Sequence, residues 1–559
     1  MTIKAGFKTV RGWSLAAAAT GCLWAGGASA QLATNLAVDV RAMSMAHAVT
    51  ADPPGIMAIH FNPAGLGKLR GRRMDLQFLG ADFSLNSEFT APPGYEIFGY
   101  SDDPVVCADA PGDGADFCRE FRTGRSSIEG ISLYVPILND AVDLPPGPLL
   151  AGPLPSFSIR PPGSRFTFAT ATYLPMAAGL YRTEDDPGNF MGRRMALERI
   201  TYLSPSVGFQ ATDTLYLGAS IGLSYQAVLL ETSFRSPNEL MGFSRIIDES
   251  ICAPFKGQSN IALDIVLFGI CRPEEGLGPF KNLADLEIAM DQRLSPSYNL
   301  GVLWEPTDWF AWGAVWHSEV DVSMSGKFAV KYANATQQTI NGIGSSPTGA
   351  IALAILGIPQ SVGTQDTGLI SMDLTMPAHF QTGIKVRPTE RWQFNVDAVW
   401  VDYSKWDAFN FTFDRATAVT ALARLFSPGS TPTRLAFPLG FESTWNLAFG
   451  VQYDLTGRIQ LRGGYEPRAS AIPNDSRNPM VPINKAQYYS LGLGYKWDKD
   501  TDIDLAIATL RSEDNIPANS SCMANCEGIE NIVYNPYAGL DIKTDATINI
   551  IGLAFRTAF

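Results

Sequence analysis

The C-terminal half of the chain consists of segments about ten residues long in which apolar residues alternate with small or polar ones. In TWNLAFGVQY (444–453), one face carries Trp, Leu, Phe, Val and Tyr, and the opposite face carries Asn, Ala, Gly and Gln. The segments at 391–400 and 488–497 repeat this pattern, with aromatic residues towards the ends and aliphatic residues between them. Such an order is typical of strands that present a lipid-facing band between two aromatic girdles, with a polar lumen behind it.

We expect fourteen segments of this kind, each bounded by turn-forming residues. They begin near residues 73, 127, 165, 200, 214, 296, 309, 370, 390, 443, 457, 487, 500 and 545. An even number is usual for bacterial outer-membrane barrels, whose two termini lie on the same side. The sequence therefore predicts an all-β fold, a fourteen-stranded antiparallel transmembrane β-barrel in a Gram-negative outer membrane.

The connections between these segments alternate in length. Those after even-numbered strands are short: QATDT, EPTDW, RPTER, DLTGR and WDKD. One exception follows the second strand, where a Pro/Gly-rich stretch runs from about 138 to 164. Those after odd-numbered strands are longer, up to roughly sixty residues between 233 and 295. Short turns belong on the periplasmic side and long loops outside the cell.

The first thirty residues have the pattern of a secretory signal peptide. A basic start (Lys4, Lys8, Arg11) precedes the apolar WSLAAAATGCLWAGG, and ASA at 28–30 is a small-residue cleavage site. Cys22 could be a lipidated residue, but the motif around it is poor. The remaining chain has no run of eighteen apolar residues, since its best candidate, AIALAILGI, ends at Pro359. A helical membrane protein is excluded.

Charge and cysteine content narrow the partners. Without the three basic residues of the leader, the formal net charge of −13 becomes −16, so nucleic acid is excluded as a partner. Six cysteines remain as near neighbours, and export favours three local disulfides. These are Cys107–Cys118, Cys252–Cys271 and Cys522–Cys526. None of the four histidines lies near a cysteine pair, so we expect no metal and no cofactor.

Two motif matches have plain structural explanations. GASIG at 218–222 fits a nucleophile elbow, but it lies inside an alternating strand rather than a strand–turn–helix unit. DKDTDID at 498–504 has Ile503 where a calcium loop needs glycine. We therefore expect that the protein is not an enzyme. The terminal Phe559 is the type of C-terminal residue that barrel-assembly machinery recognises, and Arg556 should face the lumen, because facing lipid costs ~2–4 kcal/mol at the midplane.

Several stretches resemble the long-chain fatty-acid outer-membrane transporter family (FadL-like, including aromatic-hydrocarbon transporters of the TodX type). They are FNPAGLGKL at 61–69, LYVPIL at 133–138, AVWHSEVDVSMSGKF at 314–328, VWVDYSKWDAF at 399–409, and the long run at 461–508. The resemblance covers nearly the whole exported chain. It implies a fourteen-stranded barrel that is closed by an N-terminal hatch and carries hydrophobic molecules through its wall.

The resemblance places the hatch at residues 31–72, between the signal peptide (1–30) and the barrel (73–559). Its signature is Asn62, Pro63 and Ala64, followed by Gly65 and Gly67. Pro63 fixes a tight turn, Asn62 can bond its own local backbone, and the small residues allow close packing inside a lumen. Lys68, Arg70, Arg72 and Arg73 should lie where the hatch meets the periplasmic rim.

A lateral outlet is the second feature that the resemblance implies. The third strand contains Tyr173, Leu174, Pro175 and Met176, and Pro175 lacks the N–H that a ladder position donates. We expect the strand to be interrupted around Tyr173–Ala178, leaving an opening in the wall. An ordinary proline bulge without an outlet is the alternative.

Candidate ligand contacts follow from alternation. A ligand carboxylate needs a lumen cation, and the candidates are Lys385, Arg462, Lys496 and Arg556, with His317 and His379 as weaker ones. Each could instead pair with an acid such as Glu319, Asp397 or Asp504. The stretches 282–293 and 414–426 have the pattern of short amphipathic helices in external loops, which could capture an apolar ligand.

The sequence thus favours an outer-membrane transporter of hydrophobic molecules, most readily long-chain fatty acids, surrounded by outer-membrane lipid and lipopolysaccharide and acting as a monomer. Transport of alkanes or aromatic hydrocarbons is an alternative, because a neutral ligand needs no lumen cation. A general or structural porin is another alternative, although the forty residues before the first strand argue against it. A lipase-type enzyme is the weakest, because only His317 and His379 fall in barrel segments, with no partner serine.

Overall fold

The computed structural model describes residues 35–93, 124–145, 147–235, 282–426, 429–526, 537 and 539–559. The helical elements are α1 (Val40–Ser44), η1 (Gly55–Met57), α2 (Ala58–Phe61), η2 (Pro63–Lys68), η3 (Pro187–Met191), α6 (Asn334–Gly344), α7 (Pro347–Leu356), η6 (Tyr403–Lys405), α8 (Ala418–Phe426) and η7 (Asn474–Ser476).

The strands are β1 (Arg72–Thr90), β2 (Arg125–Ser127), β3 (Ile131–Val135), β4 (Asp140–Leu144), β5 (Leu149–Ile159), β6 (Phe166–Ala171), β7 (Tyr173–Tyr181), β8 (Arg194–Leu203), β9 (Ser206–Gln210), β10 (Leu215–Arg235), β11 (Asn282–Thr307), β12 (Phe310–His317), β13 (Val320–Tyr332), β14 (Gln365–Met376), β15 (His379–Val386), β16 (Trp392–Val401), β17 (Ala408–Phe413), β18 (Arg434–Pro438), β19 (Thr444–Asp454), β20 (Ile459–Arg468), β21 (Ala486–Lys496), β22 (Thr501–Ile516) and β23 (Asp541–Ala558).

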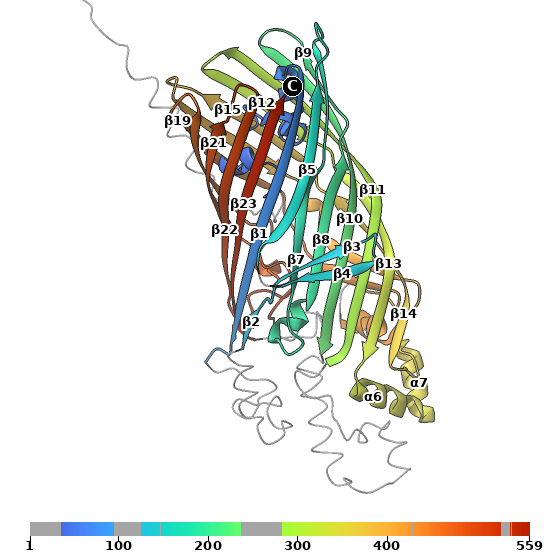
Figure 1. Cartoon of the computed structure of the whole chain (residues 1–559). Helices are drawn as coiled ribbons and strands as arrows, with labels where there is room; N and C mark the ends of the chain where they lie inside the picture. Colours follow the sequence, from blue (N-terminus) through green and yellow to red (C-terminus); the bar gives the residue numbers. More distant parts are fainter. Residues whose placement is uncertain are drawn as a thin grey trace, which may run out of the picture.

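These strands form a closed antiparallel barrel, because β23 pairs with β1 along its whole length, from Arg73 opposite Ala558 to Thr90 opposite Asp541 (Figure 1). Six of the described wall strands are broken into two segments: β6–β7, β8–β9, β12–β13, β14–β15, β16–β17 and β18–β19. When each of these pairs is counted as one strand, the described wall has the fourteen strands that the sequence predicts.

The second strand differs from its prediction. Only three residues, β2, pair with β1 near position 127, and the true second strand is β5, which lies in the stretch interpreted as a connection. Gly152 and Pro153 fall where the register with β1 shifts between Gln77 and Leu79. A bulge needs no ladder N–H at that point, so proline is tolerated there. Residues 131–144 form a separate hairpin, β3–β4.

With β5 as the second strand, the alternation of connection lengths has no exception. The turns after even-numbered strands are 160–165, 211–214, 308–309, 387–391, 455–458 and 497–500. They gather at the end of the barrel where the C-terminus lies (Figure 1), which is therefore the periplasmic rim. The connections at the opposite end are all longer, and the helices α6 and α7 extend beyond the wall there.

Two predictions about the loops have different outcomes. The stretch 282–293 is not a helix but the first half of β11, which pairs with β10 and β13 and alternates buried and more exposed residues. Residues 418–426 are helical, as α8, within the predicted stretch 414–426. Cys522 and Cys526 form a disulfide. The signal peptide and the pairs Cys107–Cys118 and Cys252–Cys271 lie outside the described residues.

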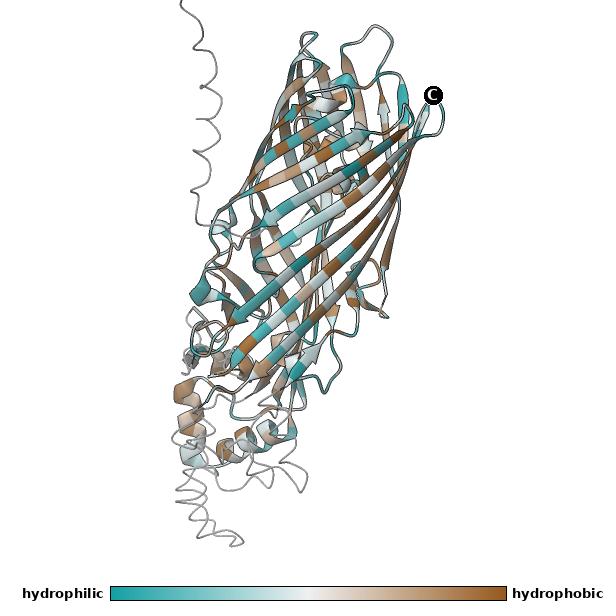
Figure 2. Ribbon diagram, turned by 90° about the vertical axis from the view of Figure 1, so that its left-hand side faces the viewer, coloured by the Kyte–Doolittle hydropathy of each residue, from teal (hydrophilic) through white to brown (hydrophobic). Residues whose placement is uncertain are grey.

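The two faces of the wall exchange polarity along the barrel. Hydrophobic and hydrophilic residues alternate along the wall strands (Figure 2). Near the periplasm the apolar residues are the ones that face outwards, as in β12, where Trp316 is 42% exposed. In β13 the buried face carries Val320, Val322 and Met324, while Asp321 and Ser323 are exposed. The break between β12 and β13 makes this possible, because a one-residue slip moves every following side chain to the other face. The lumen is therefore polar in its periplasmic half, as predicted, but apolar in its extracellular half.

The apolar residues in the extracellular half of the lumen form one large core. Its members come from the inner faces of β10, β11, β13 and β14 and from the connections that fold over them, and include Leu230, Phe234, Leu286, Ile288, Met290, Val322, Met324, Ile370, Met372, Leu374, Ala418 and Ala421. Among the described helices, none is long and apolar enough to cross a membrane by itself, although the bent pair α6–α7 passes that test jointly by length and composition.

Candidate ligand site in the barrel lumen

The N-terminal segment, residues 35–71, is packed inside the periplasmic half of the lumen, where its helices lie behind the wall strands (Figure 1). Asn62 is fully buried and bonds in three directions. Its Oδ1 accepts from the Ala64 N–H at 3.2 Å, and its Nδ2 donates to the carbonyls of Thr50 at 2.9 Å and Val302 at 3.0 Å. The Asn-Pro-Ala turn is thus fixed both to its own segment and to β11.

Lumen-facing glycines let this segment approach the wall closely. A Cβ on Gly218 would lie 2.1 Å from the Pro63 carbonyl carbon, and one on Gly301 would lie 2.1 Å from Asn62 Oδ1. No side chain fits there. Beside them, Ser220 Oγ donates to the Ile59 carbonyl at 3.0 Å. The GASIG stretch is therefore part of strand β10, where its small residues face the N-terminal segment.

Three of the four predicted lumen cations are ion-paired. Arg556 contacts Asp39 at 2.7 Å and also pairs with Asp504, while Arg462 pairs with Asp504 at 2.5 Å. Lys385 Nζ lies 2.9 Å from Glu305. Arg556–Asp39 and Lys68–Glu305 (2.8 Å) join the N-terminal segment to the wall, whereas Arg41–Asp52 (2.6 Å) lies within the segment. Lys496, at the end of β21, is exposed.

The wall is discontinuous beside Pro175. β6 pairs with β5 and β9, but β7 pairs with β8 and, among the described strands, with no barrel strand on its other side. The register between β7 and β8 also shifts between Tyr173 and Met176. The Pro175 carbonyl instead accepts a hydrogen bond of 2.8 Å from the Asn35 N–H, so the N-terminal segment contacts the third strand at this point.

A polar cavity of 80 Å³ lies where the polarity of the lumen changes. Three histidines line it: His60 from α2, and His317 and His379, which are opposite each other on β12 and β15. The rings of His317 and His379 stack at 3.7 Å, and His60 lies 5.3 Å from His317. Sequence reasoning singled out His317 and His379, but not His60.

Arg199, on β8, supplies the positive charge of this cavity. No ion pair or hydrogen bond joins its guanidinium to another group among the described residues, and its Nε is a buried donor without a partner. The pKa of His60 is lowered, chiefly because the ring is buried, and further by the neighbouring His379 and by the positive charge of Arg199. His60 is therefore a neutral ring at neutral pH, held by Asn35 Oδ1 at 3.0 Å from its Nε2.

Sequence reasoning missed Arg199 because the fourth strand was expected to begin near 200, after this residue. The available signal was alternation: Leu197, Arg199 and Thr201 share one face of β8, and Thr201 Oγ1 bonds the lumen-facing Ser224 at 2.9 Å. A charged residue on the inner face of a strand is a candidate ligand contact unless an acid neutralises it.

A second, apolar cavity of 100 Å³ adjoins the polar one, since Pro175 and Met176 line both. Its walls come from β1, β5, β7 and β23 and from the β3–β4 hairpin, and include Leu79, Phe83, Ile131, Leu133, Leu149, Leu174, Ile548 and Ile550. The pair of cavities has the chemistry of an amphipathic molecule, with a cationic, hydrogen-bonding end and an apolar end.

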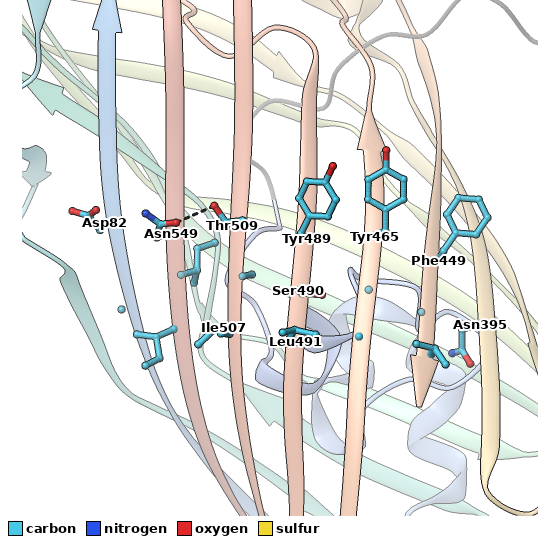
Figure 3. Close-up of a pocket in the computed structure, with 18 of the residues that line it drawn as sticks. Asp82, Asn395, Phe449, Tyr465, Tyr489, Ser490, Leu491, Ile507, Thr509 and Asn549 are labelled. Carbon is cyan, nitrogen blue, oxygen red and sulfur yellow. Dashed lines mark hydrogen bonds between the residues drawn. The ribbon is translucent and has the colours of Figure 1, made fainter. Parts of the chain in front are cut away.

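A larger hollow, of 970 Å³, is on the outer face of the wall instead (Figure 3). Tyr489, Tyr465 and Phe449 lie side by side on neighbouring strands, and Thr509 bonds Asn549 at 2.9 Å in the same row. Leu491, below this row, is 62% exposed. An aromatic row above exposed aliphatic side chains is the surface that bilayer lipid covers, so this hollow is not a lumen site.

A closed barrel with this outer face defines the class: the protein is an outer-membrane β-barrel. The family of outer membrane protein transport proteins (OMPP1/FadL/TodX) matches residues 16–559, so the chain belongs to that family. Its family and its fold are those of outer-membrane transport proteins rather than enzymes.

Similarity to individual relatives is low. The chain is 23% identical to the 47 kDa outer membrane protein of Pasteurella multocida over 244 residues (42% of this chain, 49% of that one). It is 22% identical to the long-chain fatty acid transport protein of Escherichia coli O6:H1 over 218 residues (39% and 42%). In both matches the chain spans less than half of the relative's length.

Two solved structures have the same fold. The Pseudomonas aeruginosa FadL homologue superposes with a TM-score of 0.64 at 16% identity, covering 95% of this chain and 100% of the other. The P. putida toluene transporter TodX gives a TM-score of 0.57 at 14% identity, covering 95% and 99%.

Proposed function

We propose that this protein carries long-chain fatty acids across the outer membrane. The observation that supports this most is Arg199, a cation whose buried Nε has no partner in the part of the chain that the structure describes. It lies in a cavity that meets an apolar cavity at Pro175 and Met176. A carboxylate that accepts from Arg199 forms a charge-assisted hydrogen bond, and its acyl chain continues into the apolar cavity. Unbranched Met176 and Met376 line the polar cavity and can repack to make room.

The substrate enters from outside the cell through the apolar extracellular half of the lumen. Ile351 and Ile355 of helix α7 are 62% and 78% exposed. Both belong to a long connection at the extracellular end of the barrel. We infer that these residues capture the apolar molecule. The large core in the extracellular half of the lumen, which contains several methionines and packs against α8, then passes it inwards. An apolar route of this kind does not suit ions, which argues against a general porin.

The N-terminal segment acts as a hatch. The ion pairs Lys68–Glu305 and Arg556–Asp39 and the hydrogen bond from Asn62 to Val302 hold it across the periplasmic half of the lumen, so a substrate at Arg199 meets a closed floor. Release into water is also unfavourable, since each buried CH₂ contributes about 0.8 kcal/mol. We propose that the molecule leaves sideways beside β7, where no ladder joins β7 to β5 among the described strands and the apolar cavity is lined by residues of the wall.

A neutral aromatic hydrocarbon is a second candidate substrate. The apolar cavity of 100 Å³ is small and suits a compact ligand better than a long chain without rearrangement. Such a ligand makes no use of Arg199.

The experiment is uptake of labelled oleate by cells that lack their own fatty-acid transporter and carry this gene or an empty vector. We expect faster uptake with the gene. Equal uptake contradicts the fatty-acid proposal, and a parallel assay with labelled toluene tests the second candidate.

A further inference from the structure

Basic residues concentrate at one place on the periplasmic rim of this acidic protein. The end of the N-terminal segment (68–71), the β5–β6 turn (160–165) and the β9–β10 turn (211–214) converge around a cavity of 520 Å³. Its lining is Arg70, Gly71, Arg160, Pro161, Pro162, Gly163, Ser164, Arg165, Gln210, Thr212 and Asp213. Three guanidinium groups and one carboxylate share this space, so the cavity carries a net positive charge.

The three arginines have no acidic partner among the described residues. Arg160 and Arg70 both donate to Gln210 Oε1, at 2.8 and 3.0 Å, and Arg165 donates to the Ala211 carbonyl at 3.2 Å. Nearby Lys68, by contrast, is neutralised by Glu305. Burial, followed by the charge of Arg70, lowers the pKa of Arg160 below its usual range. The cluster is thus electrostatically unsatisfied, and an anion is the group that completes it.

The cavity lies at the edge of the lipid-facing band. Phe166, directly after Arg165, stacks on Phe209 at 4.7 Å, and both belong to strands that enter the wall here. Phe166 and Phe168 are exposed on the outer face. Aromatic residues of this kind mark the level of lipid headgroups, so the arginines lie where the phosphates of the periplasmic leaflet are found.

We propose that this cavity binds the phosphate group of a phospholipid from the periplasmic leaflet, with Arg70, Arg160 and Arg165 as its donors and Phe166 beside the acyl chains. The acceptors that Arg160 and Arg165 contact are uncharged oxygen atoms, and these bonds do not use all five N–H groups of each guanidinium, so N–H groups remain for the phosphate oxygens. Arg160 also donates to the Gly67 carbonyl at 2.7 Å, so the lipid is linked to the last turn of the hatch. The proposal does not depend on which substrate the lumen takes.

The test is native mass spectrometry of the purified full chain with phosphatidylglycerol. We expect one lipid to remain bound to the unaltered protein, and the double variant R160Q/R165Q to hold it roughly 30-fold more weakly, since each arginine near an anionic lipid surface contributes about a factor of five. R165Q alone, which removes an exposed side chain with one hydrogen bond, should weaken binding about fivefold without affecting folding.

The matched control is R391Q/R458Q, two exposed arginines in other periplasmic turns, which should bind the lipid as the unaltered protein does. Equal binding by all variants overturns the site. A parallel titration with inorganic phosphate separates the sources of the anion. If free phosphate occupies the site and no lipid is retained, the lipid assignment is wrong.

Discussion

At the scale of single residues, the guanidinium of Arg199 distinguishes a fatty acid from a neutral hydrocarbon. Arg199→Met keeps the length of the side chain and removes its charge. We expect oleate to bind roughly 10- to 100-fold more weakly, because a hydrogen bond to a charged group contributes about 1.5–3 kcal/mol. Tryptophan fluorescence titration of the purified barrel measures this, and toluene binding should not change.

Lys496→Met is the control for this change, because it removes another cation that the sequence put forward but that is exposed at the periplasmic end. It should leave oleate binding unaltered. If Lys496→Met weakens binding as much as Arg199→Met does, the carboxylate is not held at the histidine cavity.

Alternation predicts which face of a strand a residue occupies, but it does not predict which residue forms an ion pair with it. Arg462, Arg556 and Lys385 are put forward by alternation, but the acids that pair with them come from distant strands and from the N-terminal segment. That Arg199 has no acidic partner within the described ranges is equally a property of the assembled barrel, so sequence spacing does not reveal it.

At the scale of elements, the hatch depends on Asn62. Asn62→Ala leaves the Thr50 and Val302 carbonyls and the Ala64 N–H without their bonds. Each unsatisfied buried group costs about 1–3 kcal/mol, so we expect the hatch to open more often. Single-channel recording in planar bilayers should show more frequent ion conductance than in the unaltered protein. The exposed Asn515→Ala is the control, and equal conductance of all three proteins argues against a hatch.

The third strand carries the prediction for release. Pro175→Val restores an N–H and favours a continuous strand, so we expect oleate uptake to fall severalfold while the barrel still assembles, as judged by heat-modifiable migration in gels. Pro467→Val, on the distant strand β20, should leave uptake unchanged. Normal uptake by a correctly assembled Pro175→Val variant contradicts the lateral outlet.

Strand number and the side of each connection followed from the sequence, because lipid imposes alternation and the assembly pathway imposes short periplasmic turns. The errors have physical causes. In β5, prolines at a bulge give the sequence the pattern of a loop. In β11 the apolar face turns into the extracellular half of the lumen, which gives 282–293 an amphipathic pattern.

At the scale of the whole molecule, the wall changes polarity at the level of the three histidines. On the periplasmic side of this level the outer face of the wall is apolar and the inner face is polar, whereas on the extracellular side the inner face is apolar. In the route that we propose, a hydrophobic molecule passes through the apolar extracellular half of the lumen, meets the cation Arg199 at the boundary, and is stopped by the hatch. The proposed route gives the substrate an orientation, with its polar end at Arg199 and its apolar end towards β7.

A structure of the protein with a long-chain fatty acid that carries bromine at its terminal carbon tests this orientation directly. We predict that the carboxylate lies within hydrogen-bonding distance of Arg199 and that the anomalous signal of bromine falls in or beyond the apolar cavity lined by Leu79 and Ile548. A bound chain whose carboxylate lies away from Arg199, or whose bromine lies at the histidines, contradicts the account.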